Sequence, residues 1–466
     1  MYYRKLYGEE MQAETKKLFR TITTIAVPMM IQNGVSNAVS LLDNLMIGQV
    51  GTNEVSGVAI SNQLIFIFYL VIFGATTGVG IFTAQYHGKG DTEGVRISFR
   101  FKLVANFVLT LICIGVFFLF SEQLISLFLK GEGEIEDVEQ TLAIGMKYMK
   151  ISLIGLVPLG IANAYSGTLR DIGKTGIPMA SSIAAIFVNL IGNALLIFGL
   201  CGCPRLGAAG AAVATVISRF VELLILVIYT GTHPEKIPFI RGAFRHFKVP
   251  GKTAFQFTLR SLPLLLNESL WAIGITFLNQ SYSLRSLSAV TAISIESTIY
   301  NVFMVAFVAM GEAVGIVIGH ILGSGEVEKA RRSAPKLIGL TVFCGLVSGI
   351  LLAVVSPFFP GVYNTTDDIK HLATMIILIY GLVMPIYSFT HASYFVIRAG
   401  GNTFITFLFD SCFVWLVSVP AAYILSRFTE IPLLPMIAMV QSLEIIKALI
   451  GGLMVRSGIW AKNIVK

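Results

Sequence analysis

Long runs of apolar residues recur along the chain and are separated by short polar segments. Each run holds about 20 residues, the length that a helix needs to cross a hydrocarbon core of roughly 30 Å. The runs lack strict alternation, so they predict helices rather than the strands of a closed barrel. We expect twelve spans, at about residues 22–48, 55–83, 101–121, 143–167, 177–200, 207–230, 254–280, 288–320, 336–357, 371–397, 404–426 and 432–456.

The composition supports an all-α integral membrane protein. Hydrophobic residues make up 55% of the 466 positions, charged residues make up 13%, and the mean hydropathy is +0.78. A soluble protein usually carries about 25% charged residues to keep its surface wet. Much of this protein's surface therefore faces lipid, and the lipid bilayer is its expected environment.

The net charge of +8 is unevenly distributed between the two sides of the predicted spans. If the N-terminus is cytoplasmic, 26 Lys and Arg residues fall on that side or in adjoining helix ends, and seven fall on the other side. This asymmetry follows the positive-inside rule. It predicts a multi-pass protein of the plasma (inner) membrane with both termini in the cytoplasm, and it explains the basic loops without a nucleic-acid partner.

The chain contains an internal repeat. A shift of 235 residues places Pro28 on Pro263 and Asn44 on Asn279, without a gap over the 69 residues from Pro28 to Arg96. The same shift places Gly88-Lys-Gly90-Asp91-Thr-Glu93 on Gly323-Ser-Gly325-Glu326-Val-Glu328, and Arg96 on Arg331. Later, a shift of 228 places Leu169-Arg170-Asp-Ile-Gly173 on Ile397-Arg398-Ala-Gly-Gly401.

The repeat predicts two pseudo-symmetric bundles of six helices. Six spans is an even number, so both halves enter the membrane in the same orientation. We expect an N-terminal bundle at 1–232, a cytoplasmic linker at 233–252 and a C-terminal bundle at 253–466. Repeats of this kind are a recurrent transporter architecture in which one bundle moves against the other. We expect a functional monomer.

The motifs resemble those of the multidrug and toxic compound extrusion (MATE) family, part of the MOP superfamily. Span 1 reads Ala26-Val-Pro28 and then Leu42-Asp43-Asn44-Leu-Met-Ile-Gly48, and the glycine motifs of both halves follow in the family's order. The resemblance covers nearly the whole chain. It implies antiport, in which protons or sodium ions enter while small organic, often cationic, compounds leave. It implies no cofactor beyond the coupling ion.

Asp43 is the first candidate for ion coupling. It lies about 23 residues after Arg20, hence roughly 35 Å further along helix 1. A desolvated carboxylate there binds a proton more readily or holds a cation. The resemblance also matches Asp43 to the family's aspartate for ion coupling in the N-terminal lobe. The alternative is a helix-end aspartate among the outer headgroups.

Three further polar residues accompany Asp43 in this prediction. Asn189 and Asn193 are four residues apart in span 5 and so share a helix face, and Thr215 lies in span 6. In relatives that resemble this chain, such oxygens complete a cation site around the aspartate. Relatives can carry a second aspartate where this chain has Asn193, and the missing charge counts against sodium. Hydrogen bonding between helices is the alternative role.

The C-terminal half has its own intramembrane acids. We expect Glu268 and Glu296 to handle a proton or a cationic substrate. Glu312 and Asp410 lie nearer the cytoplasmic ends, where a gating or packing role is expected. Pro28 and Pro263 lack an amide donor and are expected to bend their helices during gating.

Two charge pairs and two cysteines have simpler interpretations. Arg219 with Glu222, and Glu444 with Lys447, are three residues apart and predict ion pairs within one helix. The five cysteines form no disulfide or metal signature, and oxidation or metal binding is left as the alternative role for Cys201 and Cys203, which flank one glycine in a short loop. We expect no metal site beyond a possible sodium ion at Asp43.

Three alternatives to a drug exporter remain. A flippase for lipid-linked saccharides would keep the fold and change the cargo, although such proteins have a more basic cavity. A membrane enzyme lacks support, since the chain contains no HExxH or GxSxG motif. A channel would need a filter-like repeat, and none is present.

Overall fold

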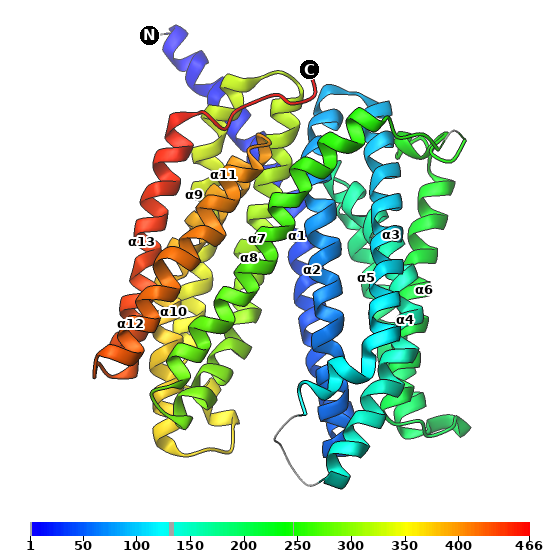
Figure 1. The fold of residues 1–466 in the computed structure, drawn as a ribbon. Coiled ribbons are helices and arrows are strands. Elements are labelled where there is room, and N and C mark those ends of the chain that lie inside the picture. Colours follow the sequence, from blue (N-terminus) through cyan, green and yellow to red (C-terminus); the bar gives the residue numbers. More distant parts are fainter. Residues whose placement is uncertain (1, 130–134, 246) are drawn as a thin grey trace. The chain divides into compact units, whose positions relative to one another are not determined.

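The computed structural model describes residues 2–129, 135–245 and 247–466, and the regular secondary structure in these ranges is all helical, without a strand. Twelve helices in the described ranges are long and apolar enough to cross a membrane, as the sequence predicted. In chain order they are α1 Tyr2–Gly48, α2 Thr52–Lys89, α3 Thr92–Ser126, α4 Ile135–Asp171, α5 Gly176–Phe198, α6 Ala208–Thr232, α7 Gly251–Ser283, α8 Leu287–Gly323, α9 Val327–Val355, α10 Asp367–Ala399, the segment 403–428, and α13 Leu433–Ser457 (Figure 1).

Several helices extend well beyond the predicted spans. Helix α1 has 47 residues and begins 20 positions before the expected start at residue 22. Helix α4 begins at Ile135 and ends at Asp171, outside the expected 143–167. Apolar composition locates only the part of a helix that contacts lipid, whereas backbone hydrogen bonding continues through the polar ends.

The segment 403–428 is not a uniform α-helix. It consists of α11 Thr403–Phe407, two π-helical turns at Leu408–Cys412 and Val414–Ser418, and α12 Val419–Phe428. Inside the first wide turn, the backbone N–H of Ser411 donates to the side-chain oxygen of Asn267 at 3.3 Å. A π-turn of this kind often occurs at a functional position, and Asp410 lies in it.

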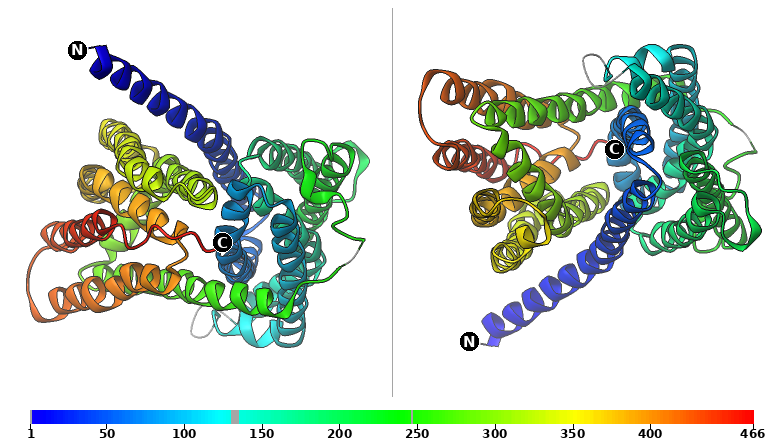
Figure 2. Two further views of the ribbon diagram at one scale, coloured as in Figure 1. Left: turned by 90° about the horizontal axis from the view of Figure 1, so that it is seen from above. Right: turned by 90° about the horizontal axis from the view of Figure 1, so that it is seen from below.

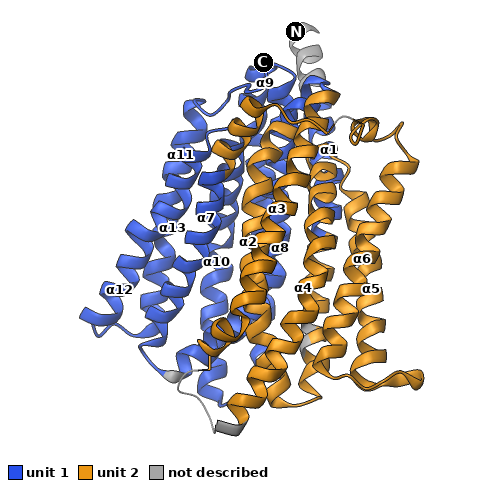
Figure 3. Cartoon of the chain, turned by 45° about the vertical axis from the view of Figure 1, so that its right-hand side comes forward, with its two compact units in different colours: residues 1–30, 84–91, 262–466 blue, residues 31–83, 92–261 orange. Residues whose placement is uncertain are grey.

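The chain forms two compact units (Figure 3). Unit 1 consists of residues 1–30, 84–91 and 262–466, and unit 2 consists of residues 31–83 and 92–261. Three of the four boundaries fall inside α1, α2 and α7, and the fourth falls between α2 and α3. The boundary in α1 follows Met30, two residues after Pro28, and the boundary in α7 precedes Leu262, the residue before Pro263. The division into 1–232, 233–252 and 253–466 follows the sequence repeat and stays a prediction.

The repeated glycines have repeated backbone conformations. Gly90 has φ of 78° and its counterpart Gly325 has φ of 87°. Gly173 and Gly401, related by the second shift, have φ of 77° and 81°. Glycine is the residue that enters this left-handed region at little cost. Equivalent motifs therefore end equivalent helices, α2 and α8 in one pair and α4 and α10 in the other.

The ends of α2 and α8 cross closely within unit 1. A Cβ atom added at Gly88 would collide with the backbone carbonyl of His320, and one added at Gly323 would collide with that of Gln85. Gln85 and His320 are themselves related by the 235-residue shift, so the contact is reciprocal. Ala84 and Gly319 are also related by this shift, and they contact each other at the same crossing.

In each half, an arginine side chain donates a hydrogen bond to the segment that follows the last helix. In unit 2, Arg96 pairs with Glu93 and donates to the carbonyl of Phe239 at 3.1 Å. In unit 1, its counterpart Arg331 pairs with Glu328 and donates to the carbonyl of Gly458 at 3.2 Å.

The predicted linker is packed against unit 2, and the C-terminal segment is packed against unit 1. In the linker, whose residue 246 lies outside the described ranges, Ile237, Phe239 and Ala243 are buried. After α13 the chain returns to the end of α2, where Gln85 donates to the carbonyl of Lys462 (Figures 1 and 2). The N-terminal helix and the C-terminus lie at the same end of unit 1 (Figure 1).

Candidate ion and substrate sites

Asp43 contacts a cluster of amide and hydroxyl groups in unit 2. It lies on α1, five residues before the helix ends, and is partly buried. Nδ2 of Asn193, on α5, donates to Oδ1 of Asp43 at 2.6 Å. Asn193 and Asn189 are 1% and 7% exposed, so the amides that face the carboxylate are shielded. The structure thus brings together the four residues that the sequence singled out for ion coupling.

The amide of Asn189 lies between Asp43 and Thr215. One terminal atom of this amide is 3.2 Å from both carboxylate oxygens, and the other is 3.1 Å from Oγ1 of Thr215 on α6. With its nitrogen towards Asp43, Asn189 donates to the carboxylate and accepts from Thr215. With its oxygen there, it accepts from Nδ2 of Asn193 at 3.3 Å and donates to Thr215. Both orientations give this amide hydrogen-bond partners.

A second series of polar side chains, joined by hydrogen bonds, crosses unit 2 from α6 to α4. Arg219 pairs with Glu222 at 3.1 Å, as the sequence predicted, and donates to Oη of Tyr69 at 2.9 Å. Glu222 accepts from Ser182 on α5 at 2.7 Å. The series of hydrogen bonds continues through Ser182, which accepts from Gln32 on α1 at 2.7 Å. Gln32 in turn accepts from Arg170 on α4 at 2.9 Å. Sequence spacing could reveal the pair within α6 but not the partners on other helices.

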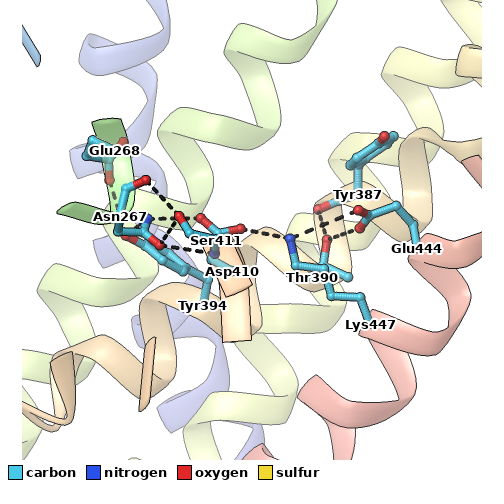
Figure 4. A network of polar contacts seen from close by, with 9 residues as sticks. All are labelled: Asn267, Glu268, Tyr387, Thr390, Tyr394, Asp410, Ser411, Glu444 and Lys447. Atoms are coloured by element: carbon cyan, nitrogen blue, oxygen red, sulfur yellow. Dashed lines mark hydrogen bonds and ion pairs between the residues drawn. The ribbon is translucent and has the colours of Figure 1, made fainter. Parts of the chain in front are cut away.

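In unit 1, Asp410 is the centre of a network over three spans (Figure 4). Its carboxylate pairs with Nζ of Lys447 on α13 at 2.7 Å and accepts from Asn267 on α7 at 3.0 Å. Glu444 is 4.0 Å from Lys447. The predicted ion pair within α13 is therefore secondary, because Lys447 is closer to Asp410 on a neighbouring helix. Asp410 is a charge partner rather than a lone acid.

Glu268 lies at the other end of this network. It accepts from Oη of Tyr394 on α10 at 3.2 Å (Figure 4). Arg398, one turn further along α10, is 8% exposed, and its guanidinium lies 5.0 Å from the ring centre of Phe395. In the described part of the chain, Nη1 of Arg398 has no hydrogen-bond partner. Neither Arg398 nor Lys447 is among the predicted site residues, although Lys447 is a basic position inside the predicted span 432–456 and Arg398 directly follows the span 371–397.

Glu296, on α8, is buried without such a partner. It is 3% exposed, and its Oε1 makes no hydrogen bond within the described ranges. Tyr300 lies four residues further along α8, on the same helix face as Glu296. The rings of Tyr300 and Tyr380 meet edge to face with their centres 5.2 Å apart. Glu296 and Glu268 therefore belong to different surroundings within unit 1.

The other predicted residues lie apart from these clusters. Pro28 and Pro263 lie inside α1 and α7, next to the boundaries between the compact units. Glu312 is in α8 and is partly buried. Cys201 and Cys203 are free thiols in the connection between α5 and α6. Across the described residues, no group of three His, Cys, Asp or Glu side chains could hold a metal ion.

Comparison with known families identifies the fold. A model of the MatE family matches residues 28–195 and 264–424, one segment in each half of the repeat and together more than half of the chain. The chain belongs to the MatE family. MatE proteins are membrane transporters, so this chain is a multi-pass transporter and not an enzyme.

Individual MatE relatives are similar over nearly the full length. A probable multidrug resistance protein NorM from Thermotoga maritima is 24% identical, over 97% of this chain and 95% of its own. A second probable NorM, from Bacillus cereus, is 26% identical over 84% and 85% of the two chains. A solved outward-facing multidrug resistance MATE transporter of the MOP superfamily matches with a TM-score of 0.84 and 19% identity, over 94% of this chain and 96% of its own. This structural likeness shows the fold.

Proposed function

We propose that this transporter exports small organic compounds, including drugs, in exchange for protons. Its relatives are named as multidrug resistance proteins. The observation that carries the coupling proposal is the contact of Asp43 with Asn193 and Asn189. Both amides lie on one face of α5, and Asn189 also forms a hydrogen bond with Thr215. A carboxylate held by shielded amides at membrane depth is a group whose charge can be tied to a conformational change.

The hydrogen bonding around Asp43 favours a proton over sodium. An ionised Asp43 is satisfied when both amide nitrogens face it. A protonated Asp43 can donate to the oxygen of Asn189 once that amide rotates, and Thr215 has a hydrogen bond in both cases. Sodium would instead need several oxygen ligands, and Asn193 directs its nitrogen at the carboxylate.

Dye efflux under imposed gradients tests this proposal. In inverted vesicles, we expect a proton gradient to drive ethidium transport and a sodium gradient alone to drive little. Asp43→Asn should abolish the driven transport while the protein still reaches the membrane. Asp368→Asn, at an exposed position in the first turn of α10, is the matched control. Undiminished transport by Asp43→Asn would overturn the assignment.

Glu296 is the proposed anchor for cationic substrates. A buried carboxylate without a hydrogen-bond partner, close to tyrosine rings, suits an organic cation, because such cations bind both negative charge and aromatic faces. We expect Glu296→Gln to weaken transport of cationic dyes and to spare neutral substrates. Equal loss for both kinds of substrate would assign Glu296 to coupling or folding instead.

We place the protein in the plasma membrane, as a monomer with both termini in the cytoplasm. The excess of Lys and Arg on one side of the spans supports this orientation.

Flipping of lipid-linked saccharides is the second candidate. Arg398 favours it, since a buried guanidinium with an unpaired N–H suits a phosphate group. Flippase activity in liposomes without dye transport would rank this function first.

A further inference from the structure

A groove of about 530 Å³ lies in unit 1 between α9 and α13. Helix α10 packs against both of these helices and contributes Phe389 to the lining. The residues from α9 recur at helical spacing and share one face of that helix. The lining consists of Arg331, Pro335, Ile338, Gly339, Val342, Phe389, Gly452, Val455, Arg456, Ser457 and Gly458.

The groove is basic at one end and apolar along its length. Arg331 lies near the start of α9, and Arg456 lies in the last turn of α13. Arg331 is partly neutralised by Glu328 at 2.9 Å and also donates to the carbonyl of Gly458. Within the described part of the chain, Arg456 makes no ion pair, so its charge is uncompensated.

The dimensions of the groove match one leaflet of a bilayer. From Arg331 to Val342 the groove follows α9 for 11 residues, or roughly 16 Å. Half of a typical hydrocarbon core is about 15 Å. Phe343 and Leu453, next to the lining on α9 and α13, are 61% and 69% exposed, so the groove adjoins an apolar surface.

We propose that this groove binds an anionic phospholipid. The phosphate lies at Arg456 and Arg331, and one acyl chain lies along Ile338, Val342 and Phe389. The basic end is the one near the chain termini, which the charge asymmetry places in the cytoplasmic leaflet. Basic pockets between helices on that side recognise anionic head groups.

Native mass spectrometry of the full-length protein tests this site. The protein in detergent is titrated with phosphatidylglycerol and with phosphatidylcholine of the same acyl chains. We expect tighter binding of phosphatidylglycerol. Arg456→Gln should reduce this affinity about fivefold, the effect of one basic residue near an anionic head group. Arg332→Gln, an exposed neighbour outside the lining, is the charge control.

A second variant tests the shape of the groove. A Cβ atom at Gly339 would meet nothing within 4 Å, so Gly339→Leu can fill the groove without distorting α9. We expect it to weaken binding of both lipids, whereas Gly115→Leu, at an equally open position on α3 of unit 2, leaves binding unchanged. Dye transport and thermal unfolding verify that each variant is folded.

Three results would overturn the proposal. The first is equal affinity for the two lipids in the unmodified protein, and the second is an affinity that neither Arg456→Gln nor Gly339→Leu alters. The third is a change of oligomeric state in these variants, which would assign the groove to a second copy of the chain.

Discussion

Asp43 and Asp410, the intramembrane aspartates of the two candidate sites, are compensated in different ways. In unit 2, amides surround Asp43, whereas in unit 1 the ammonium of Lys447 neutralises Asp410 directly. A buried acid paired with a fixed cation is a poor place to exchange ions, because its charge is already balanced. The partners of the carboxylates therefore assign ion coupling to unit 2 in our proposal.

Asn193→Asp should make transport respond to sodium. The substitution places a second carboxylate beside Asp43, where the amide nitrogen now lies 2.6 Å away. Two carboxylates repel each other unless a cation lies between them, so we expect sodium to stimulate dye efflux by the variant. Asn193→Ser, which removes the amide without adding charge, is the control. The same response to sodium in both variants would contradict this prediction.

Lys102 forms the buried ion pair whose loss should cost the most stability. Its side chain is 1% exposed and its Nζ contacts Asp171, which is 18% exposed. Removing one partner of a buried ion pair costs about 3–5 kcal/mol, and here it takes the ammonium away from the carboxylate of Asp171. We expect Lys102→Met to lower the unfolding temperature more than Lys252→Met, at an exposed position. Equal unfolding temperatures would show that Asp171 is solvated.

At the level of helices, the crossing of α2 and α8 depends on two glycines. Gly88→Ala or Gly323→Ala places a methyl group against the backbone of the partner helix, where no side-chain rotation can relieve the clash. Overpacking of this kind costs about 1–3 kcal/mol. We expect either variant to unfold at a lower temperature, whereas Gly176→Ala, with open space around it, should not. Identical melting curves for all three variants would contradict so close an approach of the two helices.

The sequence predicted the helices and their repeat better than the contacts between them. Apolar length identifies a span because the hydrocarbon core has a fixed thickness, and the glycine motifs marked the turns at Gly90 and Gly325. The sequence counts Lys102, at the start of the predicted span 101–121, only as one of the basic residues that set the topology, because charge counting cannot distinguish a solvated lysine from one buried against Asp171. The partner of Lys447 on another span could not be predicted from local spacing.

At the level of the whole molecule, the orientation in the membrane can be tested with native thiols. Cys201 is exposed in the connection between α5 and α6, which lies outside the cell in our proposed orientation. We expect a membrane-impermeant maleimide to label it in intact cells, and the double variant Cys201→Ser/Cys203→Ser to lose this labelling. In a protein that also carries Cys201→Ser and Cys203→Ser, a cysteine introduced as Glu235→Cys, in the linker, should react only after permeabilisation. Labelling of Glu235→Cys in intact cells would reverse the proposed orientation.

The reciprocal crossing of Gly88 and Gly323 has an evolutionary consequence. Each half contributes an equivalent glycine, and each glycine packs against the equivalent backbone position of the other half. The contact is therefore of the isologous type that joins two identical subunits. A gene of half this length would have encoded a protein able to associate with its own copy through this surface. Duplication and fusion then freed the two halves to diverge, so that Asp43 has a leucine, Leu278, as its counterpart.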